Sequence, residues 1–266
     1  MNPIRRGLMG AVVAAILAYM TIPAVVVLMT SFSPSELLEF PPSGLSLRWY
    51  VRALTYPDFR DAFFNGLIVT AIASTVALAV GASFAYLVDR HQFRGRGTLE
   101  AILASPLIIP HFTTGFGFLL LGAMLGVNGG FAIVVVTHVL LVLPFVTRSV
   151  YVSLRNLDPN FERSAANLGA SPGRVLAHIT IPLLLPGLAG GWLIAAILSF
   201  TEFTASLYVT AYRTQTLPVA MYTYIREYTD PTIAAISALL IVTTMTIMIV
   251  AERYLGLRRI LAIDAH

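Results

Sequence analysis

The chain has 266 residues, of which 57% are hydrophobic and 11% are charged, whereas a soluble domain carries about 25% charged residues. A soluble core cannot bury so much apolar sequence, which excludes an ordinary soluble protein. Cysteine is absent and all 17 basic residues are arginine. The sequence therefore offers no disulfide, thiolate site, Schiff-base lysine or P-loop lysine, and if ATP drives this protein, another chain must bind the nucleotide.

Long segments without charged residues predict the membrane-spanning helices. These segments are 7–35, 62–88, 101–147, 175–201 and 231–251. About 20 apolar residues cross the hydrocarbon core as a helix, so the longest segment must hold two spans, divided by a turn at Asn128-Gly129-Gly130. We expect six spans, at 8–30, 63–88, 101–125, 131–150, 184–209 and 231–252. The fold class is thus an all-α polytopic membrane protein, with residues 1–266 forming a single transmembrane domain.

The distribution of arginine predicts the orientation of the chain. With the N-terminus inside, the cytoplasmic segments hold Arg5, Arg6, Arg90, Arg94, Arg96, Arg148, Arg155, Arg163, Arg174, Arg253, Arg258 and Arg259. The opposite side holds Arg48, Arg52, Arg60, Arg213 and Arg226. This bias predicts that both termini are cytoplasmic. The isoelectric point near 9.6 then reflects topology, and we expect no nucleic-acid partner.

The two ends of the first span carry further signals. Arg5-Arg6 precede an apolar run that is longer than a signal-peptide core and has no small-residue cleavage site, so we interpret it as a retained anchor. The outer loop 31–61 follows, with apolar residues at helical spacing and Trp49 beside Tyr50. This pattern is typical of an interfacial helix, which either packs on the outer ends of the spans or docks a partner.

The inner loop 151–183 predicts a short helix–turn–helix on the cytoplasmic side. Asp158 is a good N-cap, and Gly169 can end the first helix in the left-handed conformation. Ser171-Pro172 starts a second helix, which we expect Pro182 to limit. Such a loop either braces the bundle or presents a docking element.

The spacing in this loop resembles the cytoplasmic signature of binding-protein-dependent ABC importer permeases. That signature reads Glu-Ala-Ala, three residues, Gly, nine residues, then Ile-x-Leu-Pro. Here nine residues separate Gly169 from Ile179-Thr180-Ile181-Pro182. Arg163-Ser164-Ala165 occupy the place of Glu-Ala-Ala, and Glu162 lies one position earlier.

Other segments extend the resemblance over most of the chain. They are Leu45-Ser46-Leu47-Arg48-Trp49-Tyr50, Ser199-Phe200-Thr201-Glu202-Phe203, Thr216-Leu217-Pro218-Val219 and Asp230-Pro231-Thr232-Ile233-Ala234-Ala235. The last three are similar to the polyamine (spermidine/putrescine) branch of the family. Iron, phosphonate and opine permeases share similar segments, so a solute of one of those classes, or an amino-acid-like solute, is the alternative.

The resemblance implies a type I ABC importer permease in the bacterial inner membrane. Its partners would be an ATPase dimer that carries ATP and Mg²⁺, a periplasmic substrate-binding protein and a second permease, expected to be a different chain. The chain itself would be a transport subunit without enzyme activity or cofactor, moving a small cationic solute from periplasm to cytoplasm by alternating access. The residues implied in coupling are Asp158, Phe161, Glu162, Arg163, Ala165, Leu168, Gly169 and Pro182. Either Glu162 or Arg163 would make the polar contact.

Glu202 is the acidic residue that falls well inside a predicted span. A carboxylate at a helix centre costs roughly 2.5–3.5 kcal/mol on insertion scales, so it normally faces protein or water. One interpretation is a cation contact on the translocation path, and the other is a protonated or hydrogen-bonded group between helices. Pro106 and Pro110 predict a broken third span. The candidate pathway residues are Glu202, Thr201, Thr204, Thr113 and Thr114.

Two other classes of function compete with an ATP-driven importer. An ion-coupled secondary transporter could use Glu202 as a proton carrier, but such folds show internal repeats, and the sequence has no clear repeat. A membrane hydrolase could use His111 or His138, but no catalytic grouping stands out. The histidines also lack metal-ligand spacing, so we expect ordinary hydrogen bonds and no metal site.

Overall fold

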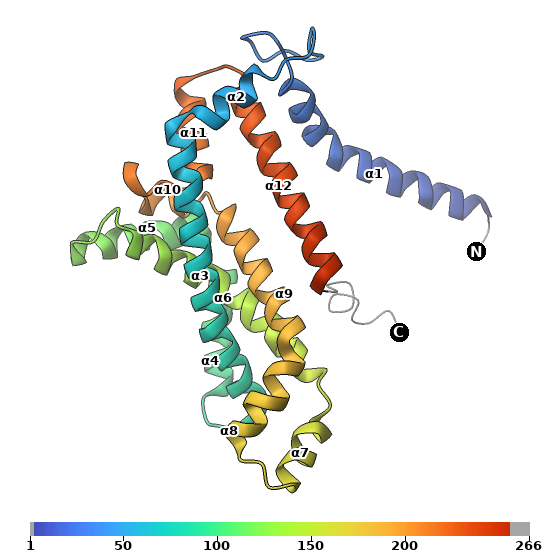
Figure 1. Ribbon diagram of the computed structural model, residues 1–266, viewed down its shortest axis with the longest axis vertical. Coiled ribbons are helices and arrows are strands. Elements are labelled where there is room, and N and C mark those ends of the chain that lie inside the picture. Colours follow the sequence, from blue (N-terminus) through green and yellow to red (C-terminus); the bar gives the residue numbers. More distant parts are fainter. Residues whose placement is uncertain (1–2, 256–266) are drawn as a thin grey trace. The chain divides into compact units, whose positions relative to one another are not determined.

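The computed structural model describes residues 3–255, and helices are its regular elements there (Figure 1). The helices are α1 (Pro3–Thr30), α2 (Arg48–Thr55), α3 (Pro57–Arg90), α4 (Arg96–Ala104), η1 (Ser105–Leu107), α5 (His111–Leu125), α6 (Phe131–Arg155), α7 (Pro159–Asn167), α8 (Pro172–Val175), η2 (Leu176–Thr180), α9 (Ile181–Phe200), α10 (Ser206–Val209), η3 (Tyr212–Thr214), α11 (Leu217–Glu227) and α12 (Thr232–Leu255). Arg258 and Arg259, which the sequence places on the cytoplasmic side, lie outside the described residues.

The described helices agree with the expected count of spans, as five or six. Five are long and apolar enough to cross a membrane, and α4–η1 with α5 makes a sixth if the bent pair counts as one span. The two parts of this pair meet at 99°, as Pro106 and Pro110 predict. The turn that divides the long apolar segment is also present, with Gly126 and Gly129 at φ of 70° and 67°.

The fifth span begins at Pro172, earlier than the expected residue 184. Pro182, which we expected to end the second helix of the inner loop, lies within this span instead. Pro172–Phe200 is one continuous 29-residue helix, and Pro182 lies in the first turn of α9. A π-helical turn, η2, comes directly before it. Such a turn adjusts the backbone where a proline supplies no N–H. The second helix of the inner loop is therefore continuous with a span.

The fifth span also ends earlier than expected, at Phe200 instead of residue 209. Residues 201–205 form a break, after which α10 begins. The Glu202 side chain accepts a hydrogen bond from the Ala205 N–H at 2.8 Å, and a side-chain acceptor of this kind competes with helix continuation. Glu202 thus lies in a break of the helix, and its expected place inside a span is wrong.

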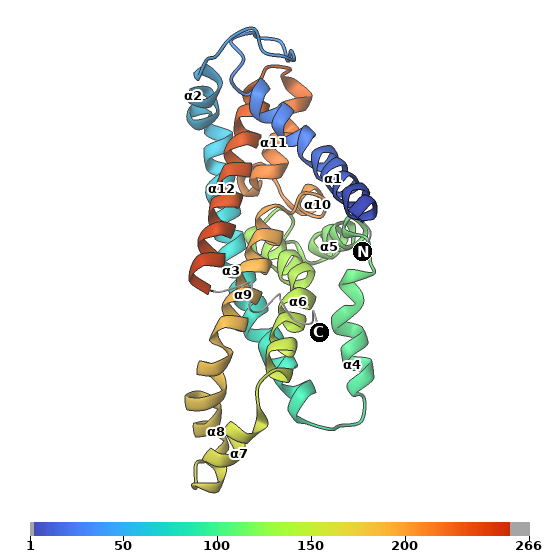
Figure 2. The ribbon, with the colours of Figure 1, turned by 90° about the vertical axis from the view of Figure 1, so that its right-hand side faces the viewer.

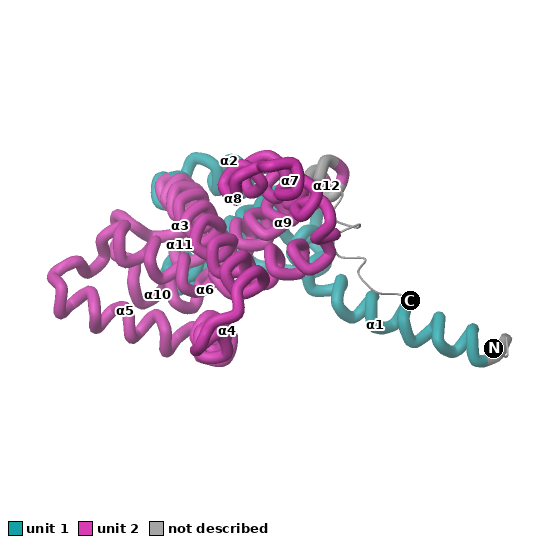
Figure 3. Tube along the Cα trace, turned by 90° about the horizontal axis from the view of Figure 1, so that it is seen from below, with its two compact units in different colours: residues 1–60, 221–245 teal, residues 61–220, 246–266 magenta. Residues whose placement is uncertain are grey.

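The chain divides into two compact units (Figure 3). Unit 1 holds residues 1–60 and 221–245, and unit 2 holds residues 61–220 with the end of α12. In unit 1 the amphipathic helix α2 confirms the helical spacing of the outer loop. Trp49 is buried and its Nε1 donates to the Ser33 carbonyl at 2.9 Å, while Leu47, Val51 and Leu54 are exposed. This exposed apolar stripe fits a helix at a membrane interface.

Asp230 holds the junction between α11 and α12 within unit 1. Its Oδ1 accepts the Thr232 N–H at 2.9 Å, which confirms the expected cap of the last span, and Arg52 Nη1 lies 3.1 Å from its Oδ2. Burial by itself raises the pKa of the Asp230 carboxyl, but hydrogen bonds from Thr232 and Tyr224 and the charge of Arg52 outweigh burial and lower this pKa below its usual value. The carboxylate is therefore ionised at neutral pH.

In unit 2 helices α3, α6 and α9 pack around a core of small and branched residues (Figure 2). Its buried members are Ala77, Ala85, Val142, Val146, Val150, Leu154, Leu184 and Ala195. A Cβ at Gly81 would lie 3.2 Å from the Thr147 backbone nitrogen, and one at Gly191 would lie 3.3 Å from the Ser149 side chain. Small residues let membrane helices approach closely, which provides the packing energy that burial from water cannot supply in lipid.

Helix α5 approaches α10 equally closely. A Cβ at Gly115 would lie 2.7 Å from the Ala205 Cα and 2.8 Å from its carbonyl oxygen. Gly117, two residues further along α5, has nothing within 4 Å of such an atom. Close approach therefore explains Gly115 and does not explain Gly117.

We expect Gly115→Ala to destabilise the protein by about 1–3 kcal/mol, because overpacking against a backbone cannot be relieved by side-chain rotation. Gly117→Ala is the matched control and should be neutral or slightly stabilising, since Ala favours a helix over Gly. Thermal unfolding in detergent, monitored by circular dichroism, measures both. Equal midpoints for the two variants would contradict the close contact.

Candidate functional site

The loop between α6 and α9 forms the expected helix–turn–helix at one end of unit 2 (Figure 1). Asp158 caps α7, because its Oδ1 accepts the Asn160 N–H at 2.9 Å. Gly169 has φ of 87° and ends the first helix in the left-handed conformation, as predicted. Ser171 is the N-cap position of α8 and Pro172 is its first residue. The turn is thus set by local sequence alone.

Large apolar side chains of this loop remain uncovered by the chain itself. Phe161 is 55% exposed and Leu168 is 89% exposed, while Ala165 on the same side of α7 is partly buried. Arg163 is also exposed. The apolar pair Phe161 and Leu168 is therefore available for contact with another surface.

Glu162 turns toward its own chain. Its Oε2 lies 3.1 Å from Arg90 Nη2 at the end of α3, and its Oε1 accepts a hydrogen bond of 2.7 Å from the Thr180 hydroxyl. Arg90 Nη1 also lies 2.7 Å from Asp89 Oδ2. Arg155 Nη1, from the last turn of α6, lies 3.9 Å from Asp89 Oδ1. The ends of three spans and α7 therefore share one charged network.

A second polar site forms where the two broken spans meet. His111 begins α5 directly after the break at 108–110, and its Nδ1 lies 2.8 Å from Glu202 Oε2. The side chains of Glu202 and His111 are 10% and 45% exposed. Both carboxylate oxygens have partners, since Oε1 accepts the Ala205 N–H. An ammonium group that reached Glu202 would have to share or replace the His111 contact.

The candidate pathway threonines lie in the same two breaks. Thr113 and Thr114 occupy the first turn of α5, and Thr201 and Thr204 flank Glu202. The structure thus brings together residues that are about 90 positions apart in sequence, as the spacing of 91 in the His111–Glu202 contact shows. The sequence missed the pairing of His111, which it treats as an ordinary histidine. A histidine directly after the Pro110 helix break was the available signal.

His138 forms hydrogen bonds to residues before and after the break at 201–205. It is buried in α6, with Nδ1 2.8 Å from the Ser199 hydroxyl and Nε2 2.9 Å from the Ser206 hydroxyl. Ser206 also bonds the Glu202 carbonyl at 3.0 Å. The predicted ordinary hydrogen bonds of this histidine are confirmed, and they tie the last turn of α9 to the first turn of α10.

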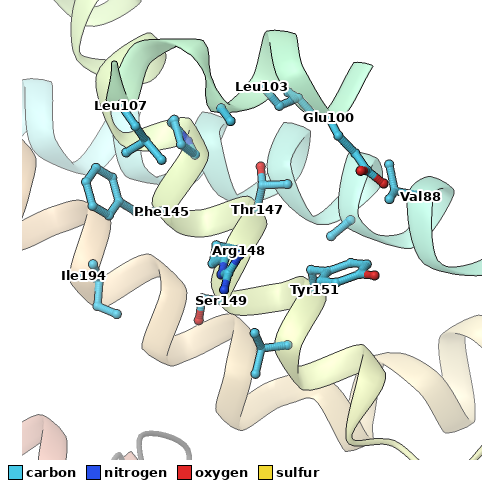
Figure 4. A pocket seen from close by; sticks show the side chains of 14 residues that line it. Val88, Glu100, Leu103, Leu107, Phe145, Thr147, Arg148, Ser149, Tyr151 and Ile194 are labelled. Atoms are coloured by element: carbon cyan, nitrogen blue, oxygen red, sulfur yellow. The ribbon is translucent and has the colours of Figure 1, made fainter. Parts of the chain in front are cut away.

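An open cavity of about 770 Å³ lies between α3, α4, α6 and α9 in unit 2 (Figure 4). Its walls are mainly apolar, with Leu103, Leu107 and Phe145 among them. Glu100 and Arg148 are its charged residues, and Glu100 is paired with Arg96 at 2.9 Å. The charges of the lining residues thus balance, and the walls carry no net negative charge that would favour a cationic ligand.

The described residues contain no group of three or more His, Cys, Asp or Glu side chains that could hold a metal ion. Within the described residues, neither the loop 151–183 nor the His111–Glu202 contact assembles a catalytic grouping of nucleophile, base and oxyanion donors.

Comparison with known proteins places this arrangement in a family. The model of the binding-protein-dependent transport system inner membrane component matches residues 77–259. The spermidine/putrescine transport system permease protein PotC of Escherichia coli (strain K12) is 28% identical over 249 residues, which cover 94% of each chain. PhnV of Salmonella typhimurium (strain LT2), named for 2-aminoethylphosphonate transport, is 29% identical over 248 residues, covering 92% of this chain and 93% of PhnV.

A solved structure shares the fold over nearly the whole chain. It is a bacterial ABC transporter involved in the import of the acidic polysaccharide alginate, with a TM-score of 0.73, 19% identity and coverage of 96% of this chain and 98% of that one. The chain therefore belongs to the binding-protein-dependent transport system inner membrane components, and it is a multi-pass permease subunit of an ABC importer in the bacterial inner membrane.

Proposed function

We propose that this permease moves a small cationic solute of the polyamine class from the periplasm to the cytoplasm. A periplasmic binding protein delivers the solute, a second permease of different sequence completes the path, and an ATPase dimer docks on the loop 151–183. The observation that carries the docking role is the uncovered apolar pair Phe161 and Leu168 on a loop whose backbone is fixed by Asp158 and Gly169.

Charge supports the solute class. Glu202 is the acidic group in the break after α9 and contacts His111 at the start of α5, and transporters bind substrates at such interruptions of helices. The similarity to PotC points to a polyamine, whereas PhnV, at similar identity, is named for 2-aminoethylphosphonate. Both solutes carry an ammonium group that a carboxylate can bind, so this site suits either.

The path for ATP energy follows from the continuous helix Pro172–Phe200. With 29 residues at 1.5 Å per residue, this rod is about 43 Å long. It starts at the turn after Gly169 and ends at the break that holds Glu202. A displacement of the docking loop thus moves the carboxylate relative to His111, and alternating access becomes a shift between two packed arrangements whose populations the nucleotide sets.

The direct test is reconstitution of the whole complex in proteoliposomes. We expect the loaded binding protein to stimulate ATP hydrolysis and radiolabelled spermidine or putrescine to accumulate on the cytoplasmic side. Uptake by the purified chain alone, driven by a proton gradient without ATP, would refute the importer and favour an ion-coupled secondary transporter. Uptake of 2-aminoethylphosphonate instead of polyamines would keep the importer and replace the solute class.

Glu202→Gln should lower the uptake of a cationic solute about tenfold or more, because an unscreened charge-assisted contact contributes about 1.5–3 kcal/mol. Assembly of the complex should persist, since the amide oxygen can still accept the Ala205 N–H. Initial uptake rates at saturating binding protein measure the effect. Glu39→Gln, at a partly exposed residue of the outer loop that is bonded to Ser43, is the control with the same charge change, and equal rates for both variants would remove Glu202 from the path.

Gly169→Val should reduce binding-protein-stimulated ATP hydrolysis several-fold, because a β-branched residue cannot adopt φ of 87° without strain. The matched control is Gly173→Val, at an exposed glycine of α8 that has nothing within 4 Å of a Cβ and no positive φ. Co-purification of the ATPase and its stimulated rate are measured together. Wild-type coupling in Gly169→Val would contradict the docking role of the turn.

A further inference from the structure

The carboxylate of Glu162 is fully engaged inside the chain. Arg90 lies 3.1 Å from one oxygen and the Thr180 hydroxyl donates to the other at 2.7 Å. The Glu162 side chain is 18% exposed, the Arg90 side chain is 19% exposed, and Thr180 is fully buried. Both oxygens of the Glu162 carboxylate are therefore already engaged by groups of the same chain.

The helical geometry of α7 places Arg163 on a different face of the helix from Glu162. Successive residues of an α-helix are rotated by about 100°, so Phe161 and Arg163 lie on opposite flanks with Glu162 between them. Arg163 is exposed, and its guanidinium takes part in none of the ion pairs found among residues 3–255. The two flanks of the helix therefore differ, one apolar with Phe161 and Leu168, the other basic.

The pairing of charges around the loop also separates Glu162 from Arg163. In the internal network the carboxylates of Asp89 and Glu162 are matched by the guanidinium groups of Arg90 and Arg155. Arg163, on the exposed side of the loop, is outside this balance. A helix that binds in a groove with this residue desolvated needs an opposite charge in the groove wall, because an unpaired buried guanidinium is strongly unfavourable.

We propose that Glu162 is an internal positioning residue that ties α7 to α3 through Arg90 and to α9 through Thr180, and that Arg163 makes the polar contact with the ATPase. The ATPase groove then has one apolar wall, for Phe161 and Leu168, and one acidic wall, for Arg163. This assignment rests on the docking role proposed above. It also gives the displacement of α7 two routes into the membrane, one through the end of α3 and one through the rod that begins at α8.

The internal tie is tested by a double-mutant cycle in the reconstituted complex with Glu162→Gln, Arg90→Gln and the double variant. The readout is the number of ATP molecules hydrolysed per solute imported, which a loss of folding alone does not change. We expect each single variant to raise this ratio several-fold while the ATPase still co-purifies, and the double variant to be no worse than either single one, since both break the same contact.

Thr180→Val removes the other hydrogen bond to Glu162 with nearly the same side-chain volume, and it should raise the same ratio by a smaller factor. Additive effects in the cycle, or loss of the ATPase from Glu162→Gln alone, would overturn the internal role of Glu162. An unchanged number of ATP molecules hydrolysed per solute imported in all the variants would also overturn the internal role of Glu162.

The outward contact is tested by charge reversal across the interface. Arg163→Glu should weaken ATPase association about tenfold or more, and Arg163→Lys, which keeps the charge, should weaken it less. Reversal of single Asp or Glu residues in the ATPase groove to Arg should include one that restores association with Arg163→Glu. Wild-type association of Arg163→Glu, or no restoring reversal among the groove carboxylates, would overturn this part of the proposal.

Leu168→Glu separates the two levels of inference. If the loop docks the ATPase, a charge on the apolar flank must release it, because a carboxylate buried among apolar groups has no partner. Retention of the ATPase by Leu168→Glu refutes the docking role itself. Release by Leu168→Glu with wild-type association of Arg163→Glu refutes only the assignment of Arg163.

Discussion

The demand that backbone polar groups be satisfied inside a membrane governs the functional part of this fold. A helix satisfies them internally, so each interruption of a span needs side chains or turns to take over. At the 201–205 break Glu202 accepts the Ala205 N–H, and at the 108–110 break the carbonyls of Ser105 and Pro110 accept the flanking N–H groups. The His111–Glu202 contact joins the two breaks. The interruptions therefore stabilise each other instead of weakening two helices separately.

The same constraint explains the distribution of small residues. In lipid no hydrophobic force draws helices together, so packing depends on the closeness of approach. Gly115 against Ala205, and Gly81 and Gly191 against α6, provide that closeness. The buried polar side chains of His138, Ser199 and Ser206 also fix the orientation of the helices. The two ring nitrogens of His138 bond to residues on opposite sides of the break. Tight packing and fixed polar contacts together hold this part of unit 2 in a defined arrangement.

The inner loop is continuous with the fifth span. The π turn at Leu176–Thr180 directly precedes the helical turn that holds Pro182, so the loop 151–183 and the break at Glu202 lie at the two ends of one continuous helix. The charged network at Arg90 and Glu162 adds a connection to α3. The loop 151–183 is thus connected to the ends of two spans, and its apolar pair, Phe161 and Leu168, is exposed.

The sequence by itself determined the elements that depend on local chemistry. Charge-free length gave the spans, Asp158 and Gly169 gave the bounds of α7, and Pro106 with Pro110 gave the broken third span. These features depend on residues within one or two helical turns of each other, so pattern and propensity suffice. The sequence alone also supplied the family resemblance through the spacing of Gly169 and Pro182.

Only the tertiary structure decided the contacts between distant segments. Sequence spacing placed Glu202 inside a helix and expected Pro182 to end one, because neither the capping of Ala205 nor the π turn is visible in a hydrophobic pattern. It also left Glu162 and Arg163 equivalent. The structure separates them, since Arg90 and Thr180 reach α7 from segments 72 and 18 residues away. Such pairings depend on how helices pack, and a single sequence does not encode them in any local signal.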